Sequence, residues 1–452
     1  MINEQDLDET VGLLSTLIQN KCVNPPGNEL RSIKSIEEFL TKKGIESQVF
    51  ESTSNRGDLV ARIKGTKDGA PSLMFGPSHV DVVPVPNPEA WEVDPFSGTV
   101  KDGYIWGRGA LDMLFIVVAQ VQAFAKLSEE NFQPKGDLVL FIVADEEAGG
   151  LYGVEWMFKN HPNLIQTDYA VSEIAGGLSL SPGRITLQIG EKGGSWKRIF
   201  FKGTPGHGSM PFASDNAINK AAKAVNLLTD YCDNKIPITT EYLSYLANGL
   251  GLGLISRFFM TNKRMIPSAL RRLRKSNPQM AKLIHSLSRM TIAPNIVKGG
   301  TKVNVIAANA YIDVDIRTLP GQDETYIITH LNKALGNLAN EAEIQAVPPE
   351  EGGVVSYGNA SPAKSDFVTA MEKAIQQEIP NAKFVPFIMP GSSDARFFRE
   401  RNIATYGFAL LDPETPMSHL TTLPHGTNER IGIKTVDLTL RAHYNLAKEF
   451  LS

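Results

Sequence analysis

The chain has 452 residues, of which 42% are hydrophobic and 21% are charged. This is the composition of an ordinary globular protein, and the length predicts roughly two or three domains. The net charge of −4 and the pI of about 6.1 do not favour nucleic acid as a partner, and no uninterrupted apolar run approaches the roughly 18 residues of a membrane span. We therefore expect a protein without a transmembrane segment that acts on small molecules.

The cysteines and the N-terminal sequence both favour the cytoplasm. Cys22 and Cys232 are too few for a disulfide framework and too far apart for a CxxC metal site, so we expect two free thiols. Residues 1–10 are acidic and lack the positive and apolar segments of a signal peptide. A cytoplasmic protein is the expectation.

The first part of the chain predicts helices that alternate with strands. Apolar spacing predicts helices over 6–21 and 28–43, and strands at 48–51 and 58–63. The apolar run that follows ends on His79. Since strands alternating with helices form layered sheets, we expect an α/β architecture.

An imidazole and a carboxylate lie two residues apart at the end of that run. On a strand, residues i and i+2 face the same way, so Asp81 can contact the ring of His79 and fix its tautomer. The other ring nitrogen is then left for a cation. The alternative is a His–Asp hydrogen bond at a strand end that binds no metal.

Further carboxylates follow the next predicted elements. Asp112 comes after a glycine-rich segment, where it is either a ligand or the N-cap of a helix over 114–128. Three carboxylates, residues 145–147, follow the strand 137–144, and Glu173 follows the strand 169–172. Such acids are costly to gather unless a cation offsets their repulsion, although a solvated loop is the alternative. Open α/β sheets bind ligands at the carboxyl ends of their strands.

A second domain is predicted from a boundary near residues 190–194. It contains a turn that carries His207 and a mixture of strands and helices, which is typical of a small α+β module. The strands are expected at 196–202, twice within 301–317 and at 343–347, and the helices at 217–231 and 324–335.

The segment 233–298 is expected to be an additional helical insert in this module. Its apolar residues have helical spacing and stand among many cations. A helical hairpin packed on the module is one interpretation, and a cover for an acyl chain or a helix at a membrane interface is the other. The apolar residues concerned are Leu243, Leu246, Leu250, Leu254, Ile255, Phe258 and Phe259.

The α/β pattern resumes from about residue 350. It contains a helix over 365–378, a glycine turn that includes Gly391, and a strand over 404–408. His425 then lies in a loop before a final helix over 434–450. Two histidines and at least three carboxylates suit a pair of zinc-like ions. In the pair Glu146 and Glu147, one acid can bind metal while the other accepts a proton from bound water.

These motifs resemble those of the M20 metallopeptidases, which include carboxypeptidases, aminoacylases, succinyl-diaminopimelate desuccinylases and acetylornithine deacetylases. The resemblance implies a zinc-exopeptidase-like catalytic domain with a central mixed sheet, formed by residues 1–192 and 350–452. It also implies an inserted α+β lid, residues 193–349, that forms a homodimer. It rests on residues 78–84, Trp91, Pro95, Phe96, 103–113, 145–147, Ser172 and Glu173, and on the segments around His207 and His425.

The resemblance also implies a role for each site residue. His79 and Glu173 would hold one metal ion, Glu147 and His425 the other, and Asp112 would bridge both. The ions would be zinc, with cobalt or manganese as alternatives. The remaining roles are Asp81 orienting His79, Glu146 as general base, His207 stabilising the oxyanion in a neighbouring subunit, and Asn304, Arg317 and Gly391 contacting the substrate.

We therefore expect a hydrolase that cleaves the amide bond of small peptides or N-acyl amino acids with a free carboxylate. Desuccinylation and deacetylation are alternatives within the enzymes. A binding protein that has lost its chemistry, or a membrane-surface protein that uses the insert 233–298, is the alternative outside them. Position 114 is Leu where many members carry Lys, and the insert is longer than the lid of compact members.

Overall fold

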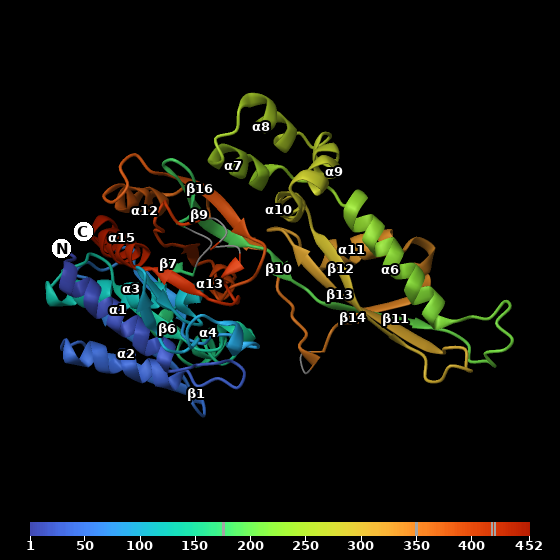
Figure 1. Cartoon of the computed structure of the whole chain (residues 1–452), viewed down its shortest axis with the longest axis horizontal. Coiled ribbons are helices and arrows are strands. Elements are labelled where there is room, and N and C mark those ends of the chain that lie inside the picture. The colour runs from blue at the N-terminus through green and yellow to red at the C-terminus, as the bar shows by residue number, and fades with distance from the viewer. Residues whose placement is uncertain (174–176, 349–350, 417–418, 420–421) are drawn as a thin grey trace. The chain divides into compact units, whose positions relative to one another are not determined.

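Buried strands form the middle of a ten-stranded mixed sheet (Figure 1). Strands β6 (Leu138–Val143) and β3 (Leu73–His79) are parallel neighbours, and all their residues are buried, as expected for strands covered on both faces. The α/β expectation is thus confirmed. The structure is a computed structural model that describes residues 1–173, 177–348, 351–416, 419 and 422–452.

The order of the strands across the sheet differs from their order in the sequence. Strand β17 (Ala404–Gly407), from the last part of the chain, is parallel to β7 (Tyr169–Ser172) and lies between β7 and β9 (Arg184–Glu191). The main path of the sheet is β1 (Ser47–Thr53), β2 (Arg56–Ile63), β6, β3, β7 (Tyr169–Ser172), β17 (Ala404–Gly407), β9 (Arg184–Glu191) and β15 (Asn359–Ala360). Strands β8 (Ser179–Ser181) and β16 (Lys383–Met389) pair with β9.

Helices cover both faces of this sheet. On one face, Phe75 of β3 meets His443 of α15, with ring centroids 5.3 Å apart. On the other face, Met74 and Phe141 belong to a core cluster with Phe398 of α13. Successive side chains of a strand point to opposite faces of a sheet, so Met74 and Phe75 contribute to the cores on the two faces. The helices of this unit are α1 (Glu4–Gln19), α2 (Leu30–Lys42), α3 (Phe115–Glu129), α4 (Val154–Asn160), α5 (Pro162–Ile165), α12 (Asp366–Gln376), α13 (Ala395–Arg399) and α15 (Ile433–Leu451).

Helix α3 is the most apolar helix of the unit. With the turn before it, the stretch Ala110–Glu129 is long and apolar enough to cross a membrane by length and composition alone. However, 89% of its most apolar window is buried inside the structure, where α3 packs against α15 and β3. It is a core helix. A small sheet of β4 (Thr99–Lys101), β5 (Tyr104–Trp106) and β18 (Arg430–Gly432) lies near its start.

The chain divides into two units. The first comprises Met1–Ile189, Ser361–Phe387 and Ser393–Ser452, and the second comprises Gly190–Ala360 and Ile388–Ser392. The first predicted domain boundary, at residues 190–194, lies where the second unit begins at Gly190. The second predicted boundary, at residue 350, lies outside the described residues. The role of the second unit as a dimerisation lid stays a prediction.

The second unit is built on a five-stranded antiparallel sheet. Helices α6 (Ala217–Asn234) and α11 (Glu324–Leu335) pack on it, and their core includes Leu228, Leu331 and Ile312. The strands are β10 (Gly193–Gly194), β11 (Lys197–Lys202), β12 (Thr291–Gly299), β13 (Asn309–Thr318) and β14 (Ala342–Ala346). The helices are α6 (Ala217–Asn234), α7 (Glu241–Gly249), α8 (Leu254–Thr261), α9 (Ile266–Ser276), α10 (Pro278–Ser288) and α11 (Glu324–Leu335).

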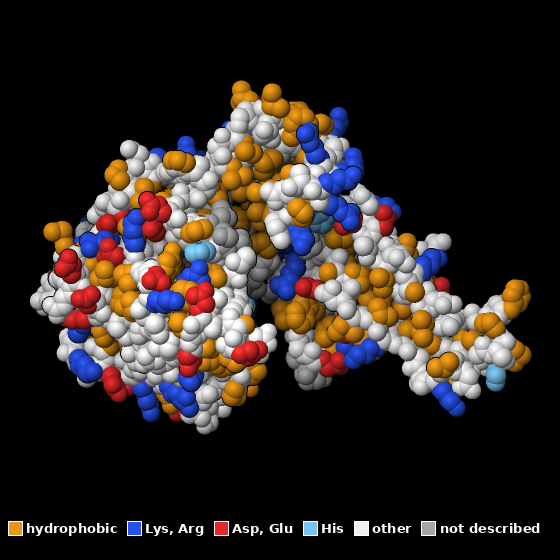
Figure 2. Space-filling model, in the orientation of Figure 1, with side chains coloured by type: hydrophobic (Ala, Val, Ile, Leu, Met, Phe, Trp, Pro, Cys, Tyr) orange, Lys and Arg blue, Asp and Glu red, His pale blue; other side chains and the backbone are white. Residues whose placement is uncertain are grey.

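The helical insert is shorter than expected at its C-terminal end. The last part of the predicted insert, residues 291–298, lies in β12, and only one of the two strands expected within 301–317 exists there, namely β13. The β-branched Ile292 and Val297 pair with Ile316 and Ile312 of β13. The leucine spacing upstream extended the helix prediction too far. Figure 2 shows hydrophobic side chains at the surface where Figure 1 labels α8.

Candidate metal centre

Three neighbouring parallel strands bring ligand-type side chains to one edge of the large sheet. In the register of β3 and β6, His79 lies opposite Val143, so the carboxylates that follow β6 start at the level of His79. Strand β7, on the other side of β3, ends just before Glu173. The carboxyl ends of these strands therefore meet where an open α/β sheet places its ligands.

Asp112 faces a different histidine with each of its carboxylate oxygens. Oδ1 lies 3.5 Å from His79 Nε2, and Oδ2 lies 3.3 Å from His425 Nε2. Glu173 Oε2 lies 3.7 Å from the same nitrogen of His79, and Glu147 Oε1 lies 3.2 Å from the same nitrogen of His425. The structure thus brings together the five predicted ligands as two groups that share Asp112. Asp112 does not cap α3, whose N-cap is at residue 114.

The charges of this cluster favour a cation. Burial alone would lower the pKa of His79, but the carboxylates around it, Asp112 first, raise that pKa well above its usual value. Asp112 and Glu147 raise the pKa of His425 to about 10. Burial tends to raise the pKa of Asp112, yet the two histidines hold it well below its usual value. The cluster therefore has an excess of negative charge for positive groups to offset.

The donor set fits divalent metal ions. His79 Nε2 is buried and makes no hydrogen bond within the described residues. The candidate ligand atoms of each group lie within 4.8 Å of one another. Imidazole nitrogens and carboxylate oxygens in such sets are typical zinc ligands. The residues of each group could therefore hold one ion.

Asp81 lies behind His79 and connects it to the loop that carries the glutamates. His79 Nδ1 lies 3.0 Å from the Asp81 carbonyl oxygen and 3.5 Å from its Oδ1. The backbone N–H groups of Glu146 and Glu147 donate to the Asp81 carboxylate at 3.2 and 3.0 Å. Although burial tends to raise the pKa of Asp81, these contacts and His79 lower it. An ionised Asp81 thus fixes both the histidine and the turn.

A buried network that the sequence analysis missed supports Asp81 in turn. Asn24 Nδ2 donates to Asp81 Oδ2 at 2.8 Å and to Asp145 Oδ1 at 3.2 Å. Arg56 pairs with Asp145 and donates to Asn24 Oδ1 at 2.6 Å. Asp145 has a left-handed φ of 73°, which directs the next two residues into the site. No local pattern marks Asn24 or Arg56 in the sequence.

A second missed network supports Asp112 and His425. Glu429 Oε1 accepts hydrogen bonds from the backbone N–H groups of Leu111 and Asp112, at 3.0 and 3.1 Å. Arg108 pairs with Glu429 and donates to the His425 carbonyl oxygen at 3.1 Å. Both side chains are buried, and burial raises the pKa of Glu429 to about 7 although Arg108 opposes this. One ion pair thus holds two candidate ligands in place.

Glu146 differs from its neighbour Glu147. Its carboxylate forms no hydrogen bond or ion pair with the described residues, whereas that of Glu147 contacts His425. Burial first, and then the charge of Glu173, raise the pKa of Glu146 well above its usual value. A carboxylate in such surroundings is suited to accept a proton near neutral pH.

The other predicted site residues lie in the second unit, in three segments of the chain. His207 and Asn304 lie in adjacent loops, because Gly208 N donates to the Asn304 carbonyl oxygen at 2.8 Å. Arg317 lies near the other end of β13, where its Nε donates to Asp315 Oδ1 at 2.8 Å. Gly391 follows β16 in the short segment Ile388–Ser392. Within this unit the structure therefore does not bring His207 and Arg317 together.

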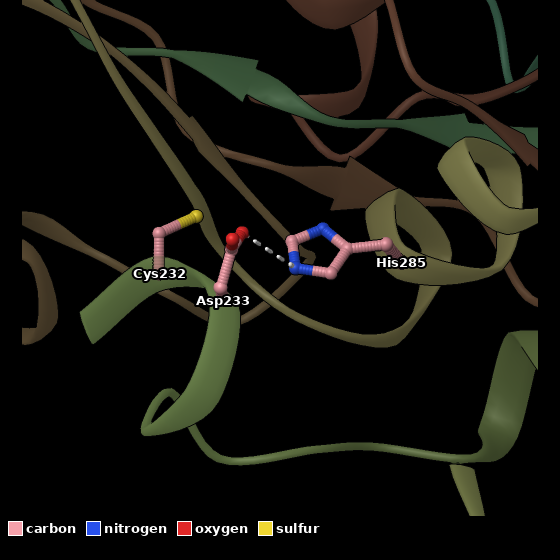
Figure 3. A group of neighbouring side chains, drawn as sticks. All are labelled: Cys232, Asp233 and His285. Carbon is pink, nitrogen blue, oxygen red and sulfur yellow. Dashed lines mark ion pairs between the residues drawn. The ribbon is translucent and has the colours of Figure 1, made fainter. Parts of the chain in front are cut away.

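The second unit contains one more group of ligand-type side chains (Figure 3). His285 Nε2 on α10 lies 4.0 Å from Asp233 Oδ1 at the end of α6, beside Cys232. Two cations, Lys192 and Arg289, are buried nearby, where they act electrostatically on the Cys232 thiol. Burial nonetheless raises the pKa of that thiol. Burial lowers the pKa of Lys192 to about 7, so Arg289 is the more persistent positive charge beside this group. Because that charge would repel a metal ion, this group does not repeat the chemistry of the first.

A mixed sheet with a histidine–carboxylate cluster at its strand ends is typical of metal-dependent hydrolases. The sequence profile of Peptidase family M20/M25/M40 matches residues 77–449, and the chain belongs to this family. It is 27% identical over 400 residues to the probable carboxypeptidase S-like 2 of Dictyostelium discoideum, covering 86% of this chain and 74% of that protein. It is 26% identical over 429 residues to aminoacylase-1 of Sus scrofa, covering 93% of this chain and 90% of that protein.

A solved structure supports the fold assignment. An M20 family metallo-carboxypeptidase of Sulfolobus solfataricus matches with a TM-score of 0.70 and 19% identity over 99% of both chains. The predicted family, fold class and enzyme class are therefore confirmed. The chain is a peptidase or amidohydrolase, of a family whose metallopeptidases use divalent metals.

The shared position of Asp112 can be tested by metal content. If each group holds one ion, Asp112→Ala should lose both, since a carboxylate shared by two dications also offsets their repulsion. His79→Ala and His425→Ala should each lose one. Elemental analysis after dialysis measures the stoichiometry, with Asp68→Ala, at an exposed position, as the control. Two equivalents bound by Asp112→Ala with unchanged affinity would show that Asp112 is not a ligand.

The network behind Asp112 gives a second prediction. In Glu429→Gln, one amide oxygen cannot accept from both backbone N–H groups and also pair with Arg108, so Asp112 and His425 lose their fixed positions. We expect metal affinity to fall by about 10- to 100-fold. Competition with a chelator measures it, beside Glu414→Gln as an exposed control. A Glu429→Gln protein with wild-type metal affinity would contradict a positioning role.

Proposed function

We propose that this enzyme hydrolyses the amide bond of N-acyl amino acids or small peptides that carry a free carboxylate, using two divalent metal ions, with zinc as the first choice. The observation that carries this proposal is Asp112, whose two oxygens face two separate groups of ligand-type side chains. A carboxylate in that position suits a shared ligand of two ions. We propose a cytoplasmic location.

The proposed roles follow from the contacts in the first unit. His79 and Glu173 would hold one ion, Glu147 and His425 the other, and Asp112 both. Such ions polarise a substrate carbonyl and lower the pKa of a bound water. Glu146, which is left free by the other side chains, would accept the proton of the attacking water and pass it to the leaving amine.

The relatives support the proposed substrate class. One is named an aminoacylase and the other a probable carboxypeptidase, and both names describe hydrolysis of an amide next to an amino acid. Arg317 would recognise the free carboxylate, because a guanidinium forms two parallel hydrogen bonds with such a group. The backbone at Gly391 would supply a further polar contact to the substrate, whereas Asn304, which lies beside His207, would contact the substrate bound to a partner subunit.

The geometry of the second unit supports a homodimer. His207 pairs with Val305, four residues before the start of β13. Arg317 lies eight residues along that strand from Asn309, which corresponds to about 27 Å. One small substrate cannot contact two groups so far apart. The loop of His207 also exposes Met210 and Phe212, by 71% and 97%. We therefore propose that His207 acts on the substrate bound to a partner subunit.

A panel of substrates tests the proposed reaction. N-acyl amino acids of graded chain length and dipeptides should be hydrolysed in the presence of zinc, cobalt or manganese. Glu146→Gln should keep its metal and lose about 10²- to 10⁴-fold or more in kcat, because the amide cannot accept a proton. Glu89→Gln, at an exposed position, is the control. Loss of the metal, or activity within a few-fold of wild type, would contradict the role of Glu146.

Mixing two inactive variants tests the action of His207 across the dimer. His207→Ala and Glu146→Gln should each be inactive alone. In a random mixture, half of the dimers are hybrids, and each hybrid has one site with an intact Glu146 and a His207 from the other subunit, so activity should return to about a quarter of wild type. No recovery after confirmed subunit exchange would show that His207 does not act across the dimer.

A further inference from the structure

Helix α8 presents an apolar face that the described part of the chain leaves open to solvent. Leu254, Ile255, Phe258 and Phe259 are 86%, 76%, 54% and 40% exposed, and no residue of the helix is buried. Positions i, i+1, i+4 and i+5 lie on one side of a helix. Large apolar side chains that gather on one exposed face mark an interaction site.

The fold of the insert does not depend on this face. Leu243 and Leu246 of α7 are buried, as are Ile284 and Leu287 of α10, so these two helices supply the core of the insert. Between α7 and α8 the chain turns at Gly251, whose φ is +61°. This turn breaks the leucine repeat, and the apolar residues that follow it leave the core.

The apolar face is surrounded by cations without acidic partners. No Asp or Glu occurs between Glu241 and Asp313 in the sequence, although the chain as a whole has a net charge of −4. None of the exposed cations of this segment forms an ion pair with a described residue, and Figure 2 shows Lys and Arg side chains beside the hydrophobic tip, over α9. The exposed cations of α8, α9, α10 and the α8–α9 loop are Arg257, Lys263, Arg264, Arg271, Arg272, Arg274, Lys275 and Lys282.

We infer that α8 and α9 dock the protein onto the surface of an anionic lipid membrane. The four apolar side chains of α8 would enter the boundary between headgroups and acyl chains, as in other interfacial amphipathic helices. The cations of α9 and the α8–α9 loop would contact lipid phosphates and carboxylates. Docking of this kind is peripheral, since α8 has eight residues and is too short to span a bilayer.

Charge and shape favour lipid over other occupants of this face. In a dimer through the same face, the cations of one copy would meet those of the other, because a twofold interface pairs a patch with itself. A single acyl chain needs a concave pocket, whereas these side chains project into solvent. An anionic bilayer supplies both an apolar layer and a negative surface. The surface uses none of the candidate ligands, so the inference does not depend on the proposed substrate.

Sedimentation of the full chain with lipid vesicles tests the inference. We expect binding to vesicles that contain about 30 mol% phosphatidylserine, and at least about tenfold weaker binding to phosphatidylcholine alone. Arg271→Gln, Arg272→Gln and Arg274→Gln together should weaken binding on the order of 100-fold. The matched control is Lys34→Gln, Lys42→Gln and Lys67→Gln, which removes the same charge from exposed positions elsewhere.

The apolar face is tested separately from the charge. Leu254→Ser with Phe258→Ser should weaken binding by more than about tenfold, while Val100→Ser with Leu151→Ser, at exposed apolar positions of the other unit, should not. Unchanged thermal unfolding and unchanged turnover of a water-soluble substrate would show that the α8 variant is folded.

Insertion gives a direct signal. Both native cysteines are buried, so a cysteine introduced by Phe258→Cys can be labelled selectively with a polarity-sensitive dye. Its emission should shift to the blue with anionic vesicles. Equal binding to neutral vesicles, no effect of either α8 or α9 variants, or a concentration-dependent dimer that the α8 variant abolishes would overturn the inference.

Discussion

The position of one carboxylate between two imidazoles is the interaction on which the first unit depends. Asp112 lies within 3.5 Å of His79 and within 3.3 Å of His425, although the three residues come from three distant segments. A group of carboxylates in a largely buried site is unstable unless positive charge offsets it. The imidazoles supply part of that charge, and divalent cations would supply more.

Buried ion pairs outside the cluster fix its geometry. Arg108 with Glu429 holds the backbone of Asp112, and Arg56 with Asp145 holds the turn that carries Glu146. Removing one member of such a pair leaves an uncompensated charge in a dry environment, which strongly destabilises its surroundings. The arrangement therefore ties the position of the candidate ligands to the integrity of the fold.

The sequence predicted well those elements that are buried along their whole length. It was less successful where burial changes from one residue to the next. Strand β6 is apolar throughout and ends near its predicted position, because burial on both faces leaves a continuous run. The ligands at strand ends were predictable since parallel strands end at the same edge of a sheet. The pair Arg108 and Glu429 was not, because the partners are 321 residues apart and no local pattern connects them. Likewise, spacing alone does not reveal that Leu246 is buried and Leu254 exposed.

The strand order has a consequence for how the protein is made. Strand β17 lies between β7 and β9, yet it is synthesised after the whole second unit, and His425 follows it by about twenty residues. A nascent chain that has reached residue 360 thus has a gap in its large sheet and exposes the edges of two strands. During that interval the first unit is vulnerable to aggregation and holds only part of its ligand set. High-affinity metal loading is therefore expected to follow synthesis rather than accompany it.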